Sequence, residues 1–194
     1  MDDLHVAHIG ALAELGGTYL EVQGKVIMRT AKRISDLAND EDDLLDLDVA
    51  QIRVHNEPAG LWEEVSSLSL NREALLLIIP TAENHVGRND LRAPGRRVRV
   101  KLYCGPLQVT GFITVPLEQT VASWHRTVRA RFLGVTQARV QPIVDTVRLD
   151  AKDSVHKFVL INRKRMTALI ESRAASARVE SAVAEPVASS SEAG

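Results

Sequence analysis

Hydrophobic and polar residues alternate along several short stretches of this chain. In residues 97–104, Val, Leu and Cys at even positions alternate with Arg, Lys and Tyr at odd positions. A Gly-Pro turn leads into a second alternating run at 107–115, and residues 20–28 show the same pattern after a Gly-Gly turn. A period of two is typical of a strand with one buried face. These stretches therefore predict strands joined by tight turns.

One short phrase occurs in both regions, as LEVQGKVI at 20–27 and as LQVTGFIT at 107–114. Gly24 and Gly111 hold the same place in it, in the register that faces inward. A glycine inside a strand usually marks a bulge, a bend or a close approach of the backbone. Small barrels need such a bend where a strand curves from one sheet into the other. We therefore predict that Gly24 and Gly111 are equivalent structural glycines.

The repeat continues beyond this phrase. Each copy has a polar stretch with an apolar pair at helical spacing, which predicts a short helix. A strand with both apolar and polar residues follows. After it comes a strand with a continuous apolar run, which we expect to be buried on both sides. In the first copy these segments are residues 30–43, 44–52 and 74–80, and in the second they are residues 117–131, 132–140 and 157–163.

We interpret this pattern as a tandem duplication of a small five-stranded unit with one helical insertion. A unit of this size can close into a barrel, and closure removes exposed sheet edges. The predicted fold is therefore mainly β with short helices, built from two small five-stranded barrels of the Sm-like or SH3-like type. We expect an acidic barrel in residues 1–80, a linker in 81–95, a basic barrel in 96–172 and a mostly disordered tail in 173–194.

Two segments at the ends of the repeat are harder to interpret. Residues 4–15 contain apolar residues near helical spacing, so a helix competes with a strand there. The first copy consequently has no clear counterpart of the strand at 97–104. After Arg163 the sequence suits a helix up to about Ala174, so we expect a C-terminal helix.

Composition narrows the class of protein. The chain has 194 residues, of which 45% are hydrophobic and 25% are charged, as is ordinary for a globular protein. No apolar run is long enough to cross a membrane as a helix, and the acidic start does not resemble a signal peptide. Cys104 is the one cysteine, so an internal disulfide is excluded. We expect a cytoplasmic protein with no membrane partner.

The charges are divided between the two copies. Residues 1–90 carry 17 Asp and Glu against 7 Lys and Arg, whereas residues 91–194 carry 8 against 17. One interpretation is that the two halves complement each other, within one chain or between chains. The other is that the basic half binds a polyanion. We favour complementarity, because a strong acidic field nearby weakens attraction to a polyanion.

The second copy resembles the Sm-like small barrels. VRVKLYCGPLQVTGFI at 98–113 is similar to their first motif, in which a glycine turn joins two strands and a glycine breaks the second. FLGVTQARV at 132–140 and FVLINRKRM at 158–166 resemble the later strand and the closing motif. The resemblance covers residues 97–166 and, less closely, 17–80. The layout also resembles uncharacterised bacterial proteins that carry this barrel in tandem.

The resemblance implies a small-barrel fold and contact with RNA. The family places an Asp and an Asn in the loop after its bent second strand, but the insertion at 117–131 replaces that loop here. The closing turn has Asn162 and Arg163 where the family shows Arg-Gly. Only Arg163 therefore corresponds to an RNA-contacting residue of the family.

The stretch RAPGRRVRVK at 92–101 is the strongest candidate for a binding site. Alternating basic side chains beside an aromatic ring are what a groove for single-stranded nucleic acid uses. The alternative is that Lys and Arg protect an edge strand from aggregation, which we favour because aromatic residues are few. The candidate nucleic-acid residues are Arg96, Arg97, Arg99, Lys101, Tyr103 and Arg163.

Catalytic and metal sites have weaker support. The acidic stretch 39–48 lacks the glycine and the ligand spacing of a calcium loop. His5 and His8 have too few neighbouring ligands for zinc, and Cys104 shares the register of buried residues with no base beside it. We therefore predict no catalytic, metal, cofactor or small-molecule site.

We predict a non-catalytic interaction or assembly module that binds itself or another protein. The first alternative is an RNA- or single-stranded-DNA-binding protein, and the second is an enzyme whose site is assembled from residues distant in sequence.

Overall fold

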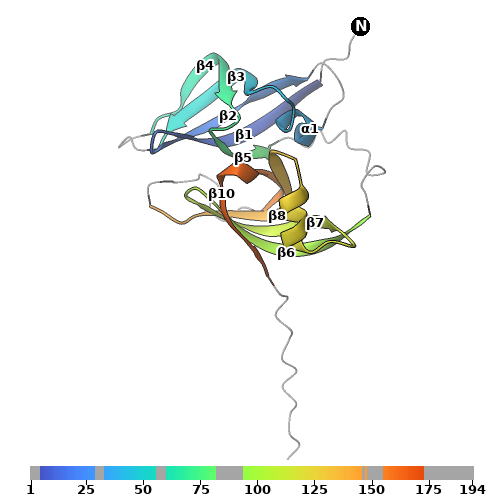
Figure 1. The fold of residues 1–194 in the computed structure, drawn as a ribbon. Coiled ribbons are helices and arrows are strands. Elements are labelled where there is room, and N and C mark those ends of the chain that lie inside the picture. Colours follow the sequence, from blue (N-terminus) through green and yellow to red (C-terminus); the bar gives the residue numbers. More distant parts are fainter. Residues whose placement is uncertain are drawn as a thin grey trace, which may run out of the picture.

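The structure, a computed structural model, describes residues 5–28, 33–55, 60–81, 94–145, 147 and 155–172 (Figure 1). It confirms a mainly β protein with short helices. The first half contains β1 (His5–Leu15), β2 (Thr18–Met28), α1 (Ile34–Ala38), β3 (Leu44–Val54), β4 (Glu63–Asn71) and β5 (Leu75–Pro80). The second contains β6 (Gly95–Cys104), β7 (Leu107–Pro116), α2 (Val121–Thr127), β8 (Phe132–Pro142), β9 (Val155–Asn162), the 3-10 turn η2 (Arg163–Arg165) and β10 (Met166–Glu171).

The described strands form one open sheet rather than two separately closed barrels. Their order is β10-β6-β7-β8-β9-β5-β1-β2-β3-β4, and all neighbouring pairs are antiparallel. The predicted closure of each half is therefore not observed. Pairing between β5 and β9 joins the halves, and β10 and β4 form the two ends of the sheet.

Each half nevertheless has the same internal order. The first reads β5-β1-β2-β3-β4 and the second reads β10-β6-β7-β8-β9, so the fifth, first, second, third and fourth strands follow one another in both. Both third strands carry a bulge in which a residue other than glycine has positive φ, namely Val49 at 50° and Gln137 at 49°. A bulge bends a strand and increases its twist, so the two halves curve at equivalent places.

Two hydrophobic clusters share the joint between the halves. At the joint Leu77 pairs with Ile161, and Ile78 pairs with Leu160. Ile78 and Leu160 belong to the cluster of the first half, whereas Leu77 and Ile161 belong to that of the second. The joint strands are thus buried on both faces, which explains why β5 has a continuous apolar run.

Two segments form strands where a helix was considered. Residues 5–15 form β1, which lies between β2 and β5, and the buried Ala7, Ile9 and Ala11 alternate along it. The predicted C-terminal helix is wrong, because β10 follows η2 and pairs with β6. In both cases hydrogen bonds to neighbouring strands outweigh the local preference for helix.

The strand correspondence also needs correction. The run at 74–80 is not the counterpart of 157–163, because β5 is the fifth strand of its half and β9 is the fourth strand of the other. The counterpart of β9 is β4, which the sequence pattern did not reveal. The counterpart of β6, which we expected to have none, is β1.

The tail at 173–194 and residues 82–93 of the predicted linker lie outside the described residues. Within the described residues, no helix has the length and apolar character needed to cross a membrane.

Candidate interaction site at the sheet edges

The joint between β5 and β9 shows how this sheet accepts an additional strand. Phe132 of β8 and Leu160 of β9 belong to the second half, yet they are buried in the cluster of the first half. Asn39, which follows α1, accepts a hydrogen bond from the Phe132 amide at 2.7 Å and donates one to its carbonyl at 3.2 Å. The incoming half thus inserts an aromatic side chain beside α1 and β5.

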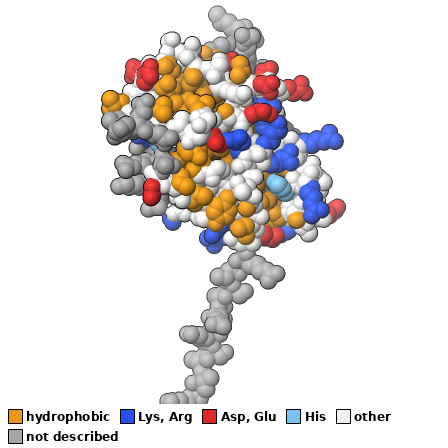
Figure 2. All heavy atoms as spheres, turned by 60° about the vertical axis from the view of Figure 1, so that its left-hand side comes forward, with side chains coloured by type: hydrophobic (Ala, Val, Ile, Leu, Met, Phe, Trp, Pro, Cys, Tyr) orange, Lys and Arg blue, Asp and Glu red, His pale blue; other side chains and the backbone are white. Residues whose placement is uncertain are grey.

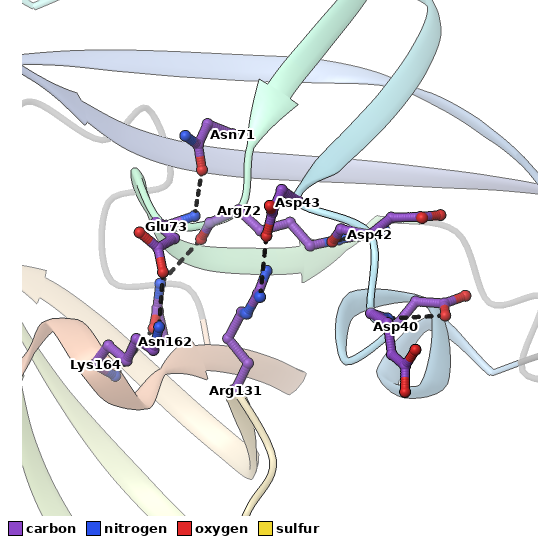
Figure 3. A network of polar contacts seen from close by, with 10 residues as sticks. Asp40, Asp42, Asp43, Asn71, Arg72, Glu73, Arg131, Asn162 and Lys164 are labelled. Atoms are coloured by element: carbon purple, nitrogen blue, oxygen red, sulfur yellow. Dashed lines mark hydrogen bonds and ion pairs between the residues drawn. The ribbon is translucent and has the colours of Figure 1, made fainter.

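Asn162, the last residue of β9, holds the joint through polar contacts. Its side chain is fully buried and its amide donates to the carbonyls of Arg72 at 3.0 Å and Leu75 at 2.8 Å. Its side-chain oxygen accepts from the Lys164 amide at 3.0 Å. Figure 3 shows Asn162 reaching upward to the turn that precedes β5. Buried polar groups need such partners, so Asn162 fixes the register of the joint.

Opposite charges meet across the joint, as Figure 3 also shows. Lys164 Nζ lies 2.7 Å from Glu73 Oε1, and Arg131 Nη2 lies 3.4 Å from Asp43 Oδ1. The hydrogen bond from Lys164, together with its charge, lowers the pKa of the Glu73 carboxyl. In each pair the acid belongs to the first half and the base to the second, as the divided charges of the sequence would suggest.

At the corresponding position in the second half, none of the described strands pairs with the outer edge of β10. A cavity of about 360 Å³ lies between α2 and β10. The strand registers make Met166 and Leu169 the equivalents of Leu75 and Ile78, because both fifth strands carry a bulge at the same place. The cavity is lined by Val121, Ala122, His125, Arg126, Met166, Thr167, Ala168, Leu169 and Glu171. We call this cavity the β10 groove.

The other end of the sheet, β4, carries the counterparts of the inserted residues. By the register of β3 with β4 and of β8 with β9, Leu44 corresponds to Phe132, Ser69 to Leu160 and Asn71 to Asn162. Leu44 is 50% exposed, in contrast to Phe132 at 2%. Asn71 accepts a hydrogen bond from the Glu73 amide at 2.8 Å, as Asn162 does from the Lys164 amide. The two ends of the sheet are therefore the open counterparts of the two sides of the joint.

Exposed apolar side chains accompany these open ends. Figure 2 shows one face on which hydrophobic side chains extend over the upper and lower parts of the molecule, while Lys and Arg gather along one side. Besides Leu44, Ile170 of β10 is 47% exposed.

The predicted nucleic-acid residues of β6 lie on one strand, which has β7 along its whole length on one side and β10 along residues 100–104 on the other. Arg97 and Arg99 are exposed, and the Arg97 guanidinium stacks over the Phe112 ring at 4.6 Å and contacts Gln137 Oε1 at 3.1 Å. β10 pairs only with Val100–Cys104, so Lys101 lies inside the sheet, whereas Arg97 precedes the paired stretch and its suggested role in protecting an edge stays a prediction. Lys101 is half-buried in the same register.

The remaining predicted residues form contacts with the protein. Arg96 Nη1 lies 3.7 Å from Glu171 Oε1, and the Tyr103 hydroxyl lies 3.2 Å from Gln108 Oε1. Arg163 Nε donates to the Ala130 carbonyl at 3.3 Å. Arg163 begins η2 directly after β9 and is bonded to the segment before β8, so it does not belong to the row of cations on β6.

Arg163 has a counterpart that clarifies its role. Arg72 donates from its guanidinium to the Asp42 carbonyl, and its amide bonds the Asp43 carbonyl. The Arg163 amide bonds the Arg131 carbonyl in the equivalent way. Both arginines thus tie the end of the fourth strand to the segment before the third, and burial lowers the pKa of Arg72.

Sequence reasoning missed two residues of the β6 face. Thr110 of β7 pairs with Lys101 on one side and with Arg139 on the other, so Arg139 extends the basic row across three strands. Phe112 lies in the same face beneath Arg97. Alternation on β8 places Arg139 outward, but only the register shows which strand it lies near.

The structural glycines stand beside the two bulges. Gly24 pairs with Ala50, and a Cβ at Gly24 would lie 3.1 Å from the Ala50 Cβ. A Cβ at Gly111 would lie 2.6 Å from Val135 Cγ1 and 2.9 Å from the Thr136 carbonyl oxygen. The backbones approach closely at both sites, and more closely in the second half.

Two further kinds of site concern the Cys104 thiol and groups of metal-ligating side chains. Burial raises the pKa of the Cys104 thiol to about 12, so a reactive thiolate does not form near neutral pH. In the part of the chain that the structure describes, no three His, Cys, Asp or Glu side chains are grouped to hold a metal ion.

Comparisons with protein-family models, with curated proteins and with solved structures found no match.

Proposed function

We propose that this protein is a non-catalytic interaction module whose open sheet edge binds a β-strand of another polypeptide. The observation that carries the proposal is the repeated edge: β9 already occupies this position on β5, while no strand of the described residues occupies the equivalent position beside the β10 groove. Adding a strand to an exposed edge gives affinity through main-chain hydrogen bonds, and pockets for side chains give specificity. The groove supplies such a pocket between α2 and β10.

The repeated strand order and the paired bulges also support an origin by tandem duplication of one five-stranded unit. In this proposal the unit is a small Sm-like barrel in which the joint replaces closure of each half. A cytoplasmic location remains part of the proposal, since the buried thiol and the lack of a possible disulfide suit a reducing compartment.

A peptide derived from β9 provides a direct test, because that strand fills the equivalent place in the first half. A synthetic peptide of residues 155–163 should bind the full chain and change the fluorescence of Trp124 in α2. A control peptide with Phe158→Ser and Leu160→Ser should bind much more weakly, since it lacks the side chains that fill the joint.

Two variants of the full chain locate the binding site. Ala122→Trp places a ring in the β10 groove, because Ala122 is exposed and lines it. Arg129→Trp adds the same ring at an exposed residue that does not line the groove. Only Ala122→Trp should abolish binding. If the β9 peptide does not bind, or binds both variants equally, the edge is not a docking site.

A second candidate function is binding of RNA or single-stranded DNA on the β6 face. It is favoured by the row of Arg97, Arg99, Lys101 and Arg139 together with the ring of Phe112. Cations track the phosphates and an aromatic ring stacks on a base in such sites.

Salt dependence tests this second candidate on the full chain. With an oligo(U) or oligo(dT) probe, three or four phosphate contacts imply a log–log salt slope of roughly −2 to −3. Replacing Arg97, Arg99 and Lys101 together by Gln should flatten the slope and leave folding unchanged. An absence of binding to either probe at low salt would exclude this function.

A further inference from the structure

We propose that the strand bound at the β10 edge is β4 of a second copy of this chain, so that molecules associate head to tail by repeating the internal joint. This inference rests on the proposed function and names the partner. The fourth strand of the second half pairs with the fifth strand of the first within one molecule. The two strands left at the ends are the remaining fourth strand, β4, and the remaining fifth strand, β10.

The proposed contact between β4 and β10, which we call the outer joint, has donors and acceptors equivalent to those that fix the internal joint between β9 and β5. Asn162 donates to the carbonyls of Arg72 and Leu75, whose equivalents are those of Arg163 and Met166. Asn71 occupies the place of Asn162, and its side chain is exposed. Its oxygen accepts from the Glu73 amide as the Asn162 oxygen accepts from the Lys164 amide, so the Asn71 amide group would take the donor role of Asn162 in the outer joint.

Both charge pairs of the joint are reproduced in the same sense. Glu73 and Lys164 occupy equivalent turns, as do Asp43 and Arg131, and each pair has opposite charges. When a second molecule adds, its Glu73 meets Lys164 of the first, and its Asp43 meets Arg131. Each base would then lie between two acids, one from its own chain and one from the next. In both the inner and the outer joint, acidic residues of a first half thus meet basic residues of a second half.

The apolar contacts predict an outer joint that is weaker than the inner one. Leu44 enters the β10 groove where Phe132 fills the inner site, and Ser69 replaces Leu160. The other face is also reduced, because Ala168 and Thr167 stand in the places of the buried Leu77 and Leu76. Less apolar area means less stabilisation. We therefore expect the association to be reversible, with the residues of the outer joint exposed to water in the free molecule.

The geometry is heterologous, because different surfaces of the two molecules meet. Such a contact forms a closed ring if the rotation per molecule closes and an open filament if it does not. Either outcome follows from the same joint.

Sedimentation velocity of the full chain over a range of concentrations tests the proposal. The chain should associate reversibly, and rising salt should weaken the association because the charge pairs are screened. Leu44→Asp should raise the dissociation constant about tenfold or more, since a charge would enter the groove. Leu61→Asp, a change at an 81% exposed residue before the opposite end of β4, should have no effect.

A gain of association makes the test sharper. Ser67 and Ser69 correspond to Phe158 and Leu160, so Ser67→Phe with Ser69→Leu gives β4 the side chains of β9. This double variant should lower the dissociation constant at least about tenfold, and adding Ala122→Trp should reverse the gain. A chain that stays monomeric at all concentrations, or a gain that survives Ala122→Trp, would overturn the proposal. Binding of the β9 peptide to a monomeric chain would then leave the docking function standing with a different partner.

Discussion

Strands β5 and β10 have the same place in their halves and different surroundings. Each follows the turn after a fourth strand, pairs with a first strand and contains a bulge at the same position. Yet β9 covers the edge of β5, whereas β10 is an end of the described sheet. The side chains follow this difference: Leu75 and Leu76 are fully buried, and their equivalents Met166 and Thr167 are not.

This comparison separates what the backbone requires from what the joint requires. The order of strands, the positive-φ bulges and the Asn-Arg turn after each fourth strand occur in both halves, so they belong to the unit itself. The adjacent, buried Leu76 and Leu77 occur where another strand is already bound, whereas Thr167 and Ala168 take their places in β10. The two leucines therefore belong to the permanent joint, and their smaller counterparts are compatible with exposure to water.

The largest expected difference between the joint and the open edge concerns Phe132 and Leu44. Phe132→Ala removes a side chain that is 2% exposed and leaves a cavity between the halves. Such changes cost about 4 kcal/mol. Leu44→Ala removes a half-exposed side chain and should cost about 0.5 kcal/mol. Urea unfolding monitored by circular dichroism measures both values at a concentration where the chain is monomeric. Equal costs would mean that the joint is not a core.

The two asparagines should differ in the same direction. Asn162→Ala removes the donors for the buried carbonyls of Arg72 and Leu75 and the cap of η2. Loss of buried partners of this kind costs about 3 kcal/mol in the free energy of unfolding. Asn71→Ala removes a cap at an exposed position and should cost about 1 kcal/mol or less. Urea midpoints of the two variants give the comparison, and a larger loss for Asn71→Ala would contradict it.

Substitutions of Gly24 and Gly111 test how tightly the backbone packs at the two bulges. In Gly111→Ala the new Cβ meets Val135 and the backbone of Thr136 at less than van der Waals distance, so the strand must shift. We expect a cost of about 2–3 kcal/mol. In Gly24→Ala the nearest atom is the Ala50 Cβ at 3.1 Å, which demands a smaller movement and a cost of about 1 kcal/mol. Thermal unfolding of the two variants would show whether the second bulge is the more tightly packed.

Local patterns in the sequence predict the parts of the fold that are made by neighbouring segments. The hairpin of β6 and β7 was predicted because alternation and a Gly-Pro turn are both local signals. The helices α1 and α2 were predicted from an apolar pair on a polar background. The sequence does not decide between helix and strand for β1, and it favours a helix for β10. The reason is that Ala-rich and Lys/Arg-rich segments suit helices when no partner strand is considered.

The candidate site depends on contacts that a local pattern does not contain. The repeated Asn-Arg at 71–72 and 162–163 was present in the sequence and would have aligned β4 with β9. Even with that alignment, insertion of Phe132 into the other half is a contact between residues far apart in the chain. The β6 row was predicted, but its extension to Arg139 depends on the register of three strands.

The smallest expected effect compares His156 of β9 with Val65, its equivalent in β4. Burial lowers the pKa of His156 below the ordinary value of 6.5, because the charged imidazolium is poorly solvated there. Above pH 6.5 the side chain is neutral in the folded and unfolded chain, and it does not affect stability. As the pH falls below 6.5, the unfolded chain takes up the proton first, so stability decreases.

His156→Val makes the position like Val65 and should reduce the loss of stability between about pH 7 and pH 5. His8→Gln, at an exposed position of β1, is the matched control and should leave that loss unchanged. The urea midpoint of each protein at both pH values measures the effect. An unaltered pH dependence in His156→Val would contradict the prediction, because the imidazolium would then be solvated as well in the folded chain as in the unfolded chain.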